Sequence, residues 1–376
     1  MSQTEVQLIK NGAVVDADIN GMSSSKLSGA LPAISGASLT NLPIPTGKTR
    51  NLIINGAMRV AQRGTSSTTS GIHTVDRIGC DFGGADENPT QEQVDVAAGT
   101  TPYSLGFRKA FKITNGNQTS GAGASDYVRT DYKIEAQDVA GSGWNYTSSS
   151  SNITLSFWVK SSVSKDFNFL IHTTDGTAKL YPMTTGTLSA DTWTKITKTI
   201  PGVSTLTFDN NNGSGIIFQI YQYLGTTYTA NSVTNNQWQN YSSTEQTPDQ
   251  TSTWWTTNNA TFELTGVQLE VGDSATDFEH RSFGDELLKC QRYYFKETAT
   301  YYAGMGYGTN ANSNCLGVLQ QPCVMRATPT ATLGSADFWG TGPSGGGQSA
   351  SYSYVYGSTS VANGPRIQGY ELSAEL

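Results

Sequence analysis

The stretch Asn152–Lys160, with the sequence NITLSFWVK, alternates apolar and polar residues and then becomes a nearly continuous apolar run. A period of two is typical of a β-strand with one buried face, because successive side chains of a strand point to opposite faces. The apolar second half indicates that this end of the strand is enclosed on both faces. We therefore assign Phe157 and Trp158 to the core.

Similar stretches recur through most of the chain, and Gly, Asn and Ser turn residues separate them. Many short strands at fairly regular spacing are typical of a two-sheet β-sandwich, so we predict an all-β protein with a jelly-roll sandwich. The predicted strands are 50–56, 107–113, 126–134, 152–160, 167–171, 193–200, 215–223 and 261–271.

The composition excludes several classes of protein. Charged residues make up 14% of the chain, against about 25% in an average globular protein, while aromatic residues reach 10%. This combination does not fit a disordered chain, which is rich in charge and poor in aromatic residues. The net charge of -7 and the lack of a basic stripe argue against nucleic-acid binding. No stretch approaches the roughly 20 apolar residues of a membrane-spanning helix.

The two ends of the chain differ from the middle. Residues 1–45 are small, polar and nearly free of aromatic residues, so they are either ordered by partners or form a flexible tether. We expect residues 1–48 to be an attachment and stalk segment with its linker, 49–283 to be the sandwich, and 284–376 to be a β-rich distal domain.

The predicted distal domain begins with a helix. Ser282–Asp285 resembles a helix start, and Glu286–Gln291 contains good helix formers. Further strands are expected around 316–319 and 352–356, with a mobile Gly-rich loop at 340–347.

Catalytic motifs are missing from the sequence. The three histidines have no metal-ligand spacing, and the sequence has neither a nucleophile elbow nor a phosphate-binding loop. Two acidic clusters could in principle hydrolyse a glycan, but both lie in predicted turns, where solvated acids are common. We expect no enzyme activity. These clusters are Asp81, Asp86 and Glu87, and Asp273, Asp277 and Glu279.

Aromatic residues in polar surroundings give a more specific hypothesis than the acidic clusters do, namely that these rings bind a sugar. The apolar faces of sugar rings stack on Trp and Tyr, while sugar hydroxyls bond to polar neighbours, so these rings are candidate ligand contacts. The alternative is that they pack in the core or at subunit interfaces. The candidates are Trp144, Tyr146, Trp238, Tyr241, Trp254, Trp255, Trp339, Tyr352, Tyr354 and Tyr356.

Several short motifs occur in a fixed order between about residues 49 and 330. They are Asn51–Gly64 with Val75–Arg77, Leu155–Ser162, Phe262–Gly272 with Phe278–Arg281, and Glu286–Tyr294 with Met325–Pro329. In this order the chain resembles the receptor-binding tail fibres of bacteriophages. The N-terminal segments Ala17–Ile19 and Lys26–Pro32 are similar to stalk segments of the same fibres.

The resemblance implies a homotrimer on the tail of the virion, made in the host cytoplasm. It also implies a jelly-roll domain like the carbohydrate-binding modules of polysaccharide enzymes. Such modules often carry a structural calcium ion, for which Asp76 and Glu270 are the candidate ligands; no other cofactor is expected.

The function that follows is adsorption. Residues 1–45 would join a tail, baseplate or adaptor protein, and the loops and distal tip would recognise a host surface glycan or protein without nucleic-acid binding or membrane insertion. Two alternatives stay open, a glycan-depolymerase tailspike and a purely structural virion or baseplate component.

Overall fold

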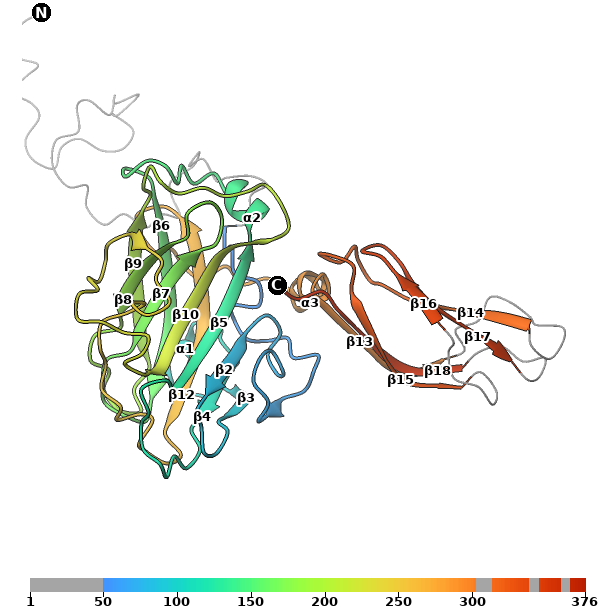
Figure 1. Cartoon of the computed structure of the whole chain (residues 1–376), viewed down its shortest axis with the longest axis horizontal. Coiled ribbons are helices and arrows are strands. Elements are labelled where there is room, and N and C mark those ends of the chain that lie inside the picture. The colour runs from blue at the N-terminus through green and yellow to red at the C-terminus, as the bar shows by residue number, and fades with distance from the viewer. Residues whose placement is uncertain (1–49, 302–312, 338–344, 360–365) are drawn as a thin grey trace, which may run out of the picture. The chain divides into compact units, whose positions relative to one another are not determined.

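Two six-stranded antiparallel sheets form a β-sandwich, which confirms the predicted all-β class (Figure 1). The computed structural model describes residues 50–301, 313–337, 345–359 and 366–376, so the predicted attachment segment 1–45 lies outside the described residues. Each sheet is named here after a central strand.

The β12 sheet has the strand order β1 (Ser66–Ser67), β3 (Thr90–Asp95), β4 (Lys109–Thr114), β12 (Thr261–Val271), β6 (Asn152–Ser161), β9 (Thr194–Pro201). The β10 sheet has the order β11 (Gln239–Asn240), β8 (Lys179–Thr184), β7 (Asn168–Thr173), β10 (Ser214–Leu224), β5 (Tyr127–Glu135), β2 (Gly79–Gly83). Two short helices, α1 (Thr101–Ser104) and α2 (Ala136–Ala140), lie in connections.

Aromatic rings from both sheets meet in the core. Phe157 of β6 packs edge-on against Phe169 of β7, with 5.3 Å between ring centroids, and lies 5.7 Å from Phe218 of β10. All three rings are buried, which confirms the assignment of Phe157. The assignment of Trp158 is wrong: it lies on the other face of β6, is half-buried, and packs with Phe107 outside the sandwich core.

The predicted strand at 50–56 is also wrong, because the side chains of Asn51 and Asn55 bind backbone groups and fold the segment into turns. Asn51 Oδ1 accepts from the backbone N–H groups of Ile53 (2.9 Å) and Leu269 (3.0 Å), and Asn51 Nδ2 donates to Val267 O (3.1 Å). Asn55 has a positive φ of 60° and donates through Nδ2 to two backbone carbonyls. The segment is a series of turns that fastens the chain to β12.

Beyond the sandwich, α3 (Phe283–Gln291) confirms the predicted helix, and Ser282 Oγ caps it by accepting from Asp285 N (3.2 Å). Two three-stranded sheets follow. Their strand orders are β13 (Tyr294–Tyr301), β18 (Arg366–Ser373), β15 (Thr330–Asp337), and β14 (Ser313–Leu319), β17 (Ser353–Thr359), β16 (Gly345–Gln348).

The expected loop at 340–347 is only partly covered by the structure. Residues 340–344 lie outside the described part of the chain, and Gly345–Gly347 belong to β16, so that part of the prediction is wrong. The segment pairs with β17, and this pairing gives its backbone N–H and C=O groups hydrogen-bond partners in spite of the Gly-rich composition. No helix within the described ranges is long and apolar enough to cross a membrane.

An ion pair with a buried carboxylate fastens the segment after α3 to the sandwich. Glu135, at the end of β5, is fully buried, and its two carboxylate oxygens accept from Arg292 Nε and Nη2 at 2.8 Å each. Tyr293 also donates to Glu135 Oε1 (2.6 Å). Burial acts to raise the pKa of Glu135, but these hydrogen bonds outweigh it and hold the pKa below its ordinary value.

We expect Asn51→Ala to lower the free energy of unfolding by about 3 kcal/mol, since each buried polar group left without a partner costs about 1–3 kcal/mol. The substitution removes the acceptor of two backbone N–H groups and the donor to Val267 O. Urea unfolding followed by tryptophan fluorescence measures the change. The exposed Asn117→Ala is the matched control, with an expected change below about 0.5 kcal/mol. Equal losses in both variants would contradict the role of Asn51.

Candidate functional site

A row of polar side chains crosses the outer face of the β10 sheet. On β5, Val128, Tyr132 and Ile134 face the core, so the alternation turns Arg129 and Asp131 outward. Register then places Gln219 and Tyr221 of β10 opposite Asp131 and Arg129, and Asp81 of β2 opposite Arg129 on the other side. Three strands thus bring their polar residues to one patch.

Hydrogen bonds fix this patch. Arg129 donates from Nε to Asp131 Oδ2 (2.9 Å) and from Nη2 to Asp81 Oδ2 (3.3 Å). Gln219 Nε2 donates to Asp131 Oδ1 (2.6 Å). The Tyr221 hydroxyl lies within hydrogen-bonding distance of Gln219 Oε1 (2.9 Å) and Gln246 Oε1 (2.7 Å). The patch is therefore held in a single arrangement before any ligand arrives.

Burial divides the patch into two parts. Gln219, Tyr221 and Gln246 are buried and act as support, whereas Asp81 and Arg129 keep about a third of their side-chain surface in solvent, at 33% and 29%. A ligand can therefore reach a guanidinium and a carboxylate whose positions are already fixed.

The carboxyl groups of Asp81 and Asp131 interact, and their pKa values shift in opposite directions. Burial is the main cause that raises the pKa of Asp131 to about 7, and the hydrogen bond with Asp81 adds to it. Burial also acts to raise the pKa of Asp81, but the hydrogen bond from Asp131 and the charge of Arg129 outweigh it and lower the pKa. Asp131 is thus the proton donor of the pair and Asp81 the anion.

Aromatic rings flank the patch. Tyr127, half-buried at the start of β5, packs edge-on against Tyr228 with 6.0 Å between centroids, and Arg129 lies 5.4 Å from its ring. Farther across the sheet, His172 stacks on the exposed Tyr241 at 4.2 Å and 11°. Burial and the nearby Arg129 lower the pKa of His172 to about 4, so this imidazole is neutral at physiological pH.

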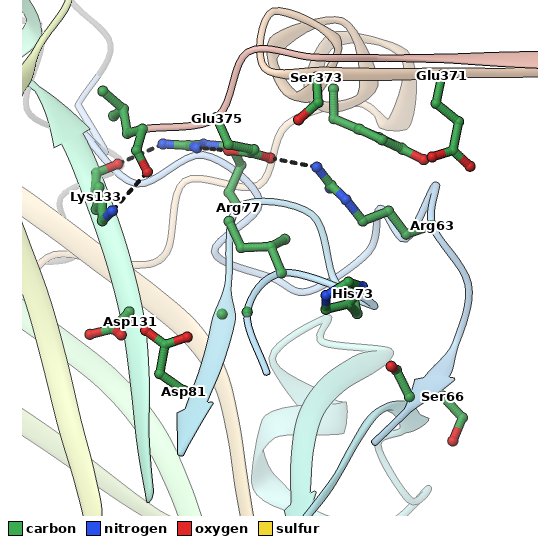
Figure 2. Close-up of a pocket in the computed structure, with 16 residues that line it drawn as sticks. Arg63, Ser66, His73, Arg77, Asp81, Asp131, Lys133, Glu371, Ser373 and Glu375 are labelled. Carbon is green, nitrogen blue, oxygen red and sulfur yellow. Dashed lines mark hydrogen bonds and ion pairs between the residues drawn. The ribbon is translucent and has the colours of Figure 1, made fainter. Parts of the chain in front are cut away.

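The polar patch continues into a pocket of about 610 Å³, to which Asp81, Asp131 and Lys133 also contribute (Figure 2). Its other walls come from the segment around Arg63–Arg77, from Tyr294 of β13, and from Glu371 and Glu375 near the end of the chain. A pocket of this size with converging polar groups and shifted pKa values is the default candidate for a binding site.

One carboxylate ties the far wall of the pocket together (Figure 2). Glu375 forms ion pairs with Arg77 Nη1 and with Arg63 Nη2, the second at 3.1 Å. Arg77 is almost fully buried, donates from Nη2 to Lys133 O (2.6 Å), and lies 3.5 Å from the Tyr293 ring. The ion pair with Glu375 therefore neutralises the charge of Arg77, its guanidinium stacks on the Tyr293 ring, and Arg77 forms part of the pocket wall.

Three of the predicted ligand contacts belong to the core. Trp144, Trp254 and Trp255 are 3%, 0% and 0% exposed, so they present no ring face to a ligand, and the packing alternative holds for them. Each indole N–H instead donates to a backbone carbonyl. Large rings bury more area than other side chains, which explains why Trp in a polar stretch is still drawn into the core.

The remaining candidates divide by exposure. Tyr146 and Trp238 are half-buried and pack on core rings, while Tyr241 is 38% exposed at the edge of the patch. In the C-terminal part, Tyr352 is 60% exposed and stacks with Tyr354 at 6.4 Å.

Two predicted contacts cannot be placed. Trp339 lies outside the described residues. Tyr356 lies in β17, where its backbone pairs with that of Leu316 in β14, but the structure does not describe the Tyr356 side chain.

The candidate calcium ligands do not fit a calcium ion. Both Asp76 oxygens accept from Gln62, and Arg63 lies 3.7 Å away. Glu270 accepts from Gln268 and Thr276. Each carboxylate is thus satisfied by protein donors, and within the described ranges no three His, Cys, Asp or Glu residues come together as a metal site.

Sequence reasoning missed the centre of the site. Asp81 was placed in a turn, but it lies in β2, and its partners Arg129 and Asp131 were noted only as part of an alternating strand. The alternation showed that these side chains share a face. The strand that lies beside them is decided by long-range pairing, which no local sequence pattern encodes.

Comparison with known proteins gives only distant similarities. No family model and no curated protein matches the chain. Among solved structures, the enzymatically active domain of tailspike protein 4 from bacteriophage CBA120 is similar at 9% identity and a TM-score of 0.30, over 59% of this chain and 21% of that chain. This chain therefore spans about a fifth of the tailspike domain.

Two carbohydrate-binding modules are also similar. A CBM4 module matches at 13% identity and a TM-score of 0.29, over 58% of this chain and 98% of the module. A family 11 module of a Clostridium thermocellum cellulosomal cellulase matches at 15% identity and a TM-score of 0.25, over 58% and 98%. Similarity at this level carries no argument about function, and the β-sandwich is established by its own strand pairing.

We expect the Asp131 carboxyl to make the fold less stable as the pH rises. A carboxyl whose folded pKa is raised contributes stability that is present below its ordinary pKa of about 4 and is lost as the pH passes its folded pKa of about 7. Asp131→Asn mimics the protonated form, so its unfolding free energy should fall less between pH 4 and 8 than that of the wild type. Urea titrations at several pH values measure both slopes.

The exposed Asp273→Asn serves as the control for the removal of one negative charge. It should leave the pH dependence as in the wild type. An Asp131→Asn curve parallel to the wild-type curve would contradict the raised pKa of Asp131.

Proposed function

We propose that this chain is a receptor-binding tail fibre of a bacteriophage, and that it recognises a host surface glycan through the outer face of the β10 sheet. The observation that carries the proposal is the fixed polar patch of Asp81, Arg129 and Asp131 beside Tyr127, which opens into the 610 Å³ pocket. Sugars need both kinds of contact, because their hydroxyls bond to charged groups while their C–H faces pack on aromatic rings.

The remaining parts of the proposal follow from the sequence motifs. Residues 1–45 would attach to a tail, baseplate or adaptor protein, and three copies of the chain would assemble on the virion. The stacked Tyr352 and Tyr354 offer a second contact surface in the C-terminal part. Weak single sites would be sufficient, because several copies on one particle multiply their affinity.

Binding without hydrolysis is the reading we favour. The two acids of a glycosidase stand about 5 Å or more apart, with the sugar between them. Asp81 and Asp131 are instead hydrogen-bonded to each other, so the bond to be cut does not fit between them. We therefore propose that the pair binds hydroxyl groups.

The first experiment is cell labelling by the fluorescently tagged full chain on a panel of candidate hosts, with the mass in solution measured alongside. We expect a trimer that labels one host and blocks phage adsorption to it. Arg129→Ala should weaken labelling at least about tenfold, which corresponds to about 1.4 kcal/mol and lies at the low end for a charged hydrogen bond.

Arg108→Ala is the matched control, because Arg108 is an exposed arginine of the same chain that stacks on Tyr103 away from the patch. Its labelling should equal that of the wild type. A folded trimer that labels no host would leave only a structural role, and a stable monomer would contradict the fibre. Release of sugar fragments from host envelope glycan, abolished by Asp81→Asn, would establish the depolymerase alternative.

A further inference from the structure

A second hollow lies on the opposite outer face of the sandwich, over the β12 sheet. Its volume is about 240 Å³, and it shares no residue with the pocket beside the polar patch. Its lining includes Trp158, Lys195, Gly266, Asp277, Phe278 and His280.

A β-bulge in β12 opens this hollow. Thr265 pairs with Trp158 of β6 and Gln268 pairs with Ser156, so two residues of β12 stand opposite the single residue Phe157. One of the two, Gly266, has a φ of +63°, and a Cβ atom there would lie 2.6 Å from the ring of Phe107. Only glycine fits both conditions, and its missing side chain leaves the floor of the hollow open.

An aromatic wall is fixed along one side of the hollow. Phe278 packs edge-on against Phe107 at 4.9 Å and 71°, and the His280 ring lies 4.9 Å from Phe278. His280 Nε2 is 2.9 Å from the carbonyl oxygen of Leu105, which holds the imidazole in place. The wall therefore costs little ordering entropy when a ligand binds.

Trp158 completes the apolar surface from the strand side. It is half-buried, and its register places it directly opposite Thr265 on one side and Lys195 on the other. Because Trp158 lies on the solvent face of the sheet, its ring does not pack in the sandwich core. The part of the ring that is not buried lines the hollow, where it can contact a ligand.

Lys195 and Asp277 bring one positive and one negative charge to the hollow. Lys195 and Asp277 are exposed, and neither side chain is in an ion pair within the part of the chain that the structure describes. One positive and one negative group do not favour a phosphate or sulfate, which would need several cations. Nor do they favour a quaternary ammonium ion, because Lys195 would repel it. A neutral ligand with hydroxyl groups satisfies both.

We propose that this hollow is a second sugar site that takes one neutral pyranose ring, stacked against Trp158 with its hydroxyls bonded to Lys195 and Asp277. The volume supports one ring, since it falls below the roughly 300–1,000 Å³ of sites for larger ligands. The location of the site stands on its own geometry, and only the choice of a sugar rests on the proposed function.

Two sugar sites on opposite faces of one sandwich would let a single chain hold two glycan strands. The second contact would then be intramolecular, and the effective concentration it meets would raise the overall affinity without any tighter single site. A branched or densely packed surface glycan fits this arrangement better than an isolated chain.

The experiment is saturation-transfer NMR on the full chain with methyl pyranosides of glucose, galactose, mannose, rhamnose and N-acetylglucosamine. We expect at least one to bind, with affinity lowered about tenfold or more by Trp158→Ala, because the substitution removes the ring on which the sugar stacks. Lys195→Ala, a change at an exposed residue, should lower the affinity for the same sugar several-fold.

Trp193→Ala is the matched control, because Trp193 is a half-buried Trp in the same outer cluster that does not line the hollow. Its sugar binding should equal that of the wild type. The proposal is overturned if no methyl pyranoside binds, if Lys195→Ala has no effect, or if Trp193→Ala loses binding as Trp158→Ala does. Arg129→Ala separates the two sites: a signal lost only in that variant would overturn the second site and support the first.

Discussion

The two-residue alternation of β5 and β10 is the constraint on which both the core and the site depend. Val128, Tyr132 and Phe218 close the sandwich from one face of these strands, while Arg129 and Asp131 build the polar patch from the other. A register shift of one residue would send the charged groups into the core and the apolar groups into solvent. The large cost of that exchange holds the patch in its register as firmly as its own hydrogen bonds do.

The patch itself is stabilised from below. Buried amides and a tyrosine hydroxyl, those of Gln219, Gln246 and Tyr221, satisfy groups that would otherwise be costly to enclose. The raised pKa of Asp131 and the lowered pKa of Asp81 favour one negative charge on this pair in place of two. Preorganisation of this kind reduces the entropy that a flexible ligand site would lose on binding.

Local sequence patterns predicted the parts of the fold that are locally determined. β12 and the capped helix α3 were found because period-two alternation and a Ser cap act within a few residues. The turn at Asn51 was missed because its partners Val267 and Leu269 lie on β12, more than 200 residues away. Trp158 was given the wrong face because an apolar run hides the alternation that Phe157 and Trp158 still obey.

The candidate site was less predictable than the fold for the same reason. Exposed aromatic residues can be guessed from polar neighbours, but Trp254 and Trp255 show that such neighbours do not decide burial. Asp81 and Asp131 are brought together by strand pairing between β2 and β5. Their relation is a property of the assembled sheet.

The order in which the chain is synthesised decides when the pocket of Figure 2 can form. Its walls include residues near 63–81 and Glu371–Leu376, and about 300 residues of chain separate these two segments. During synthesis, at about 5–20 residues per second, the sandwich strands emerge well before the residues that complete the pocket. For that interval the chain can have a closed core and no finished pocket. Completion of this pocket thus follows the emergence of the sandwich strands, and a chain that stops before Glu371 but folds its sandwich would still lack it.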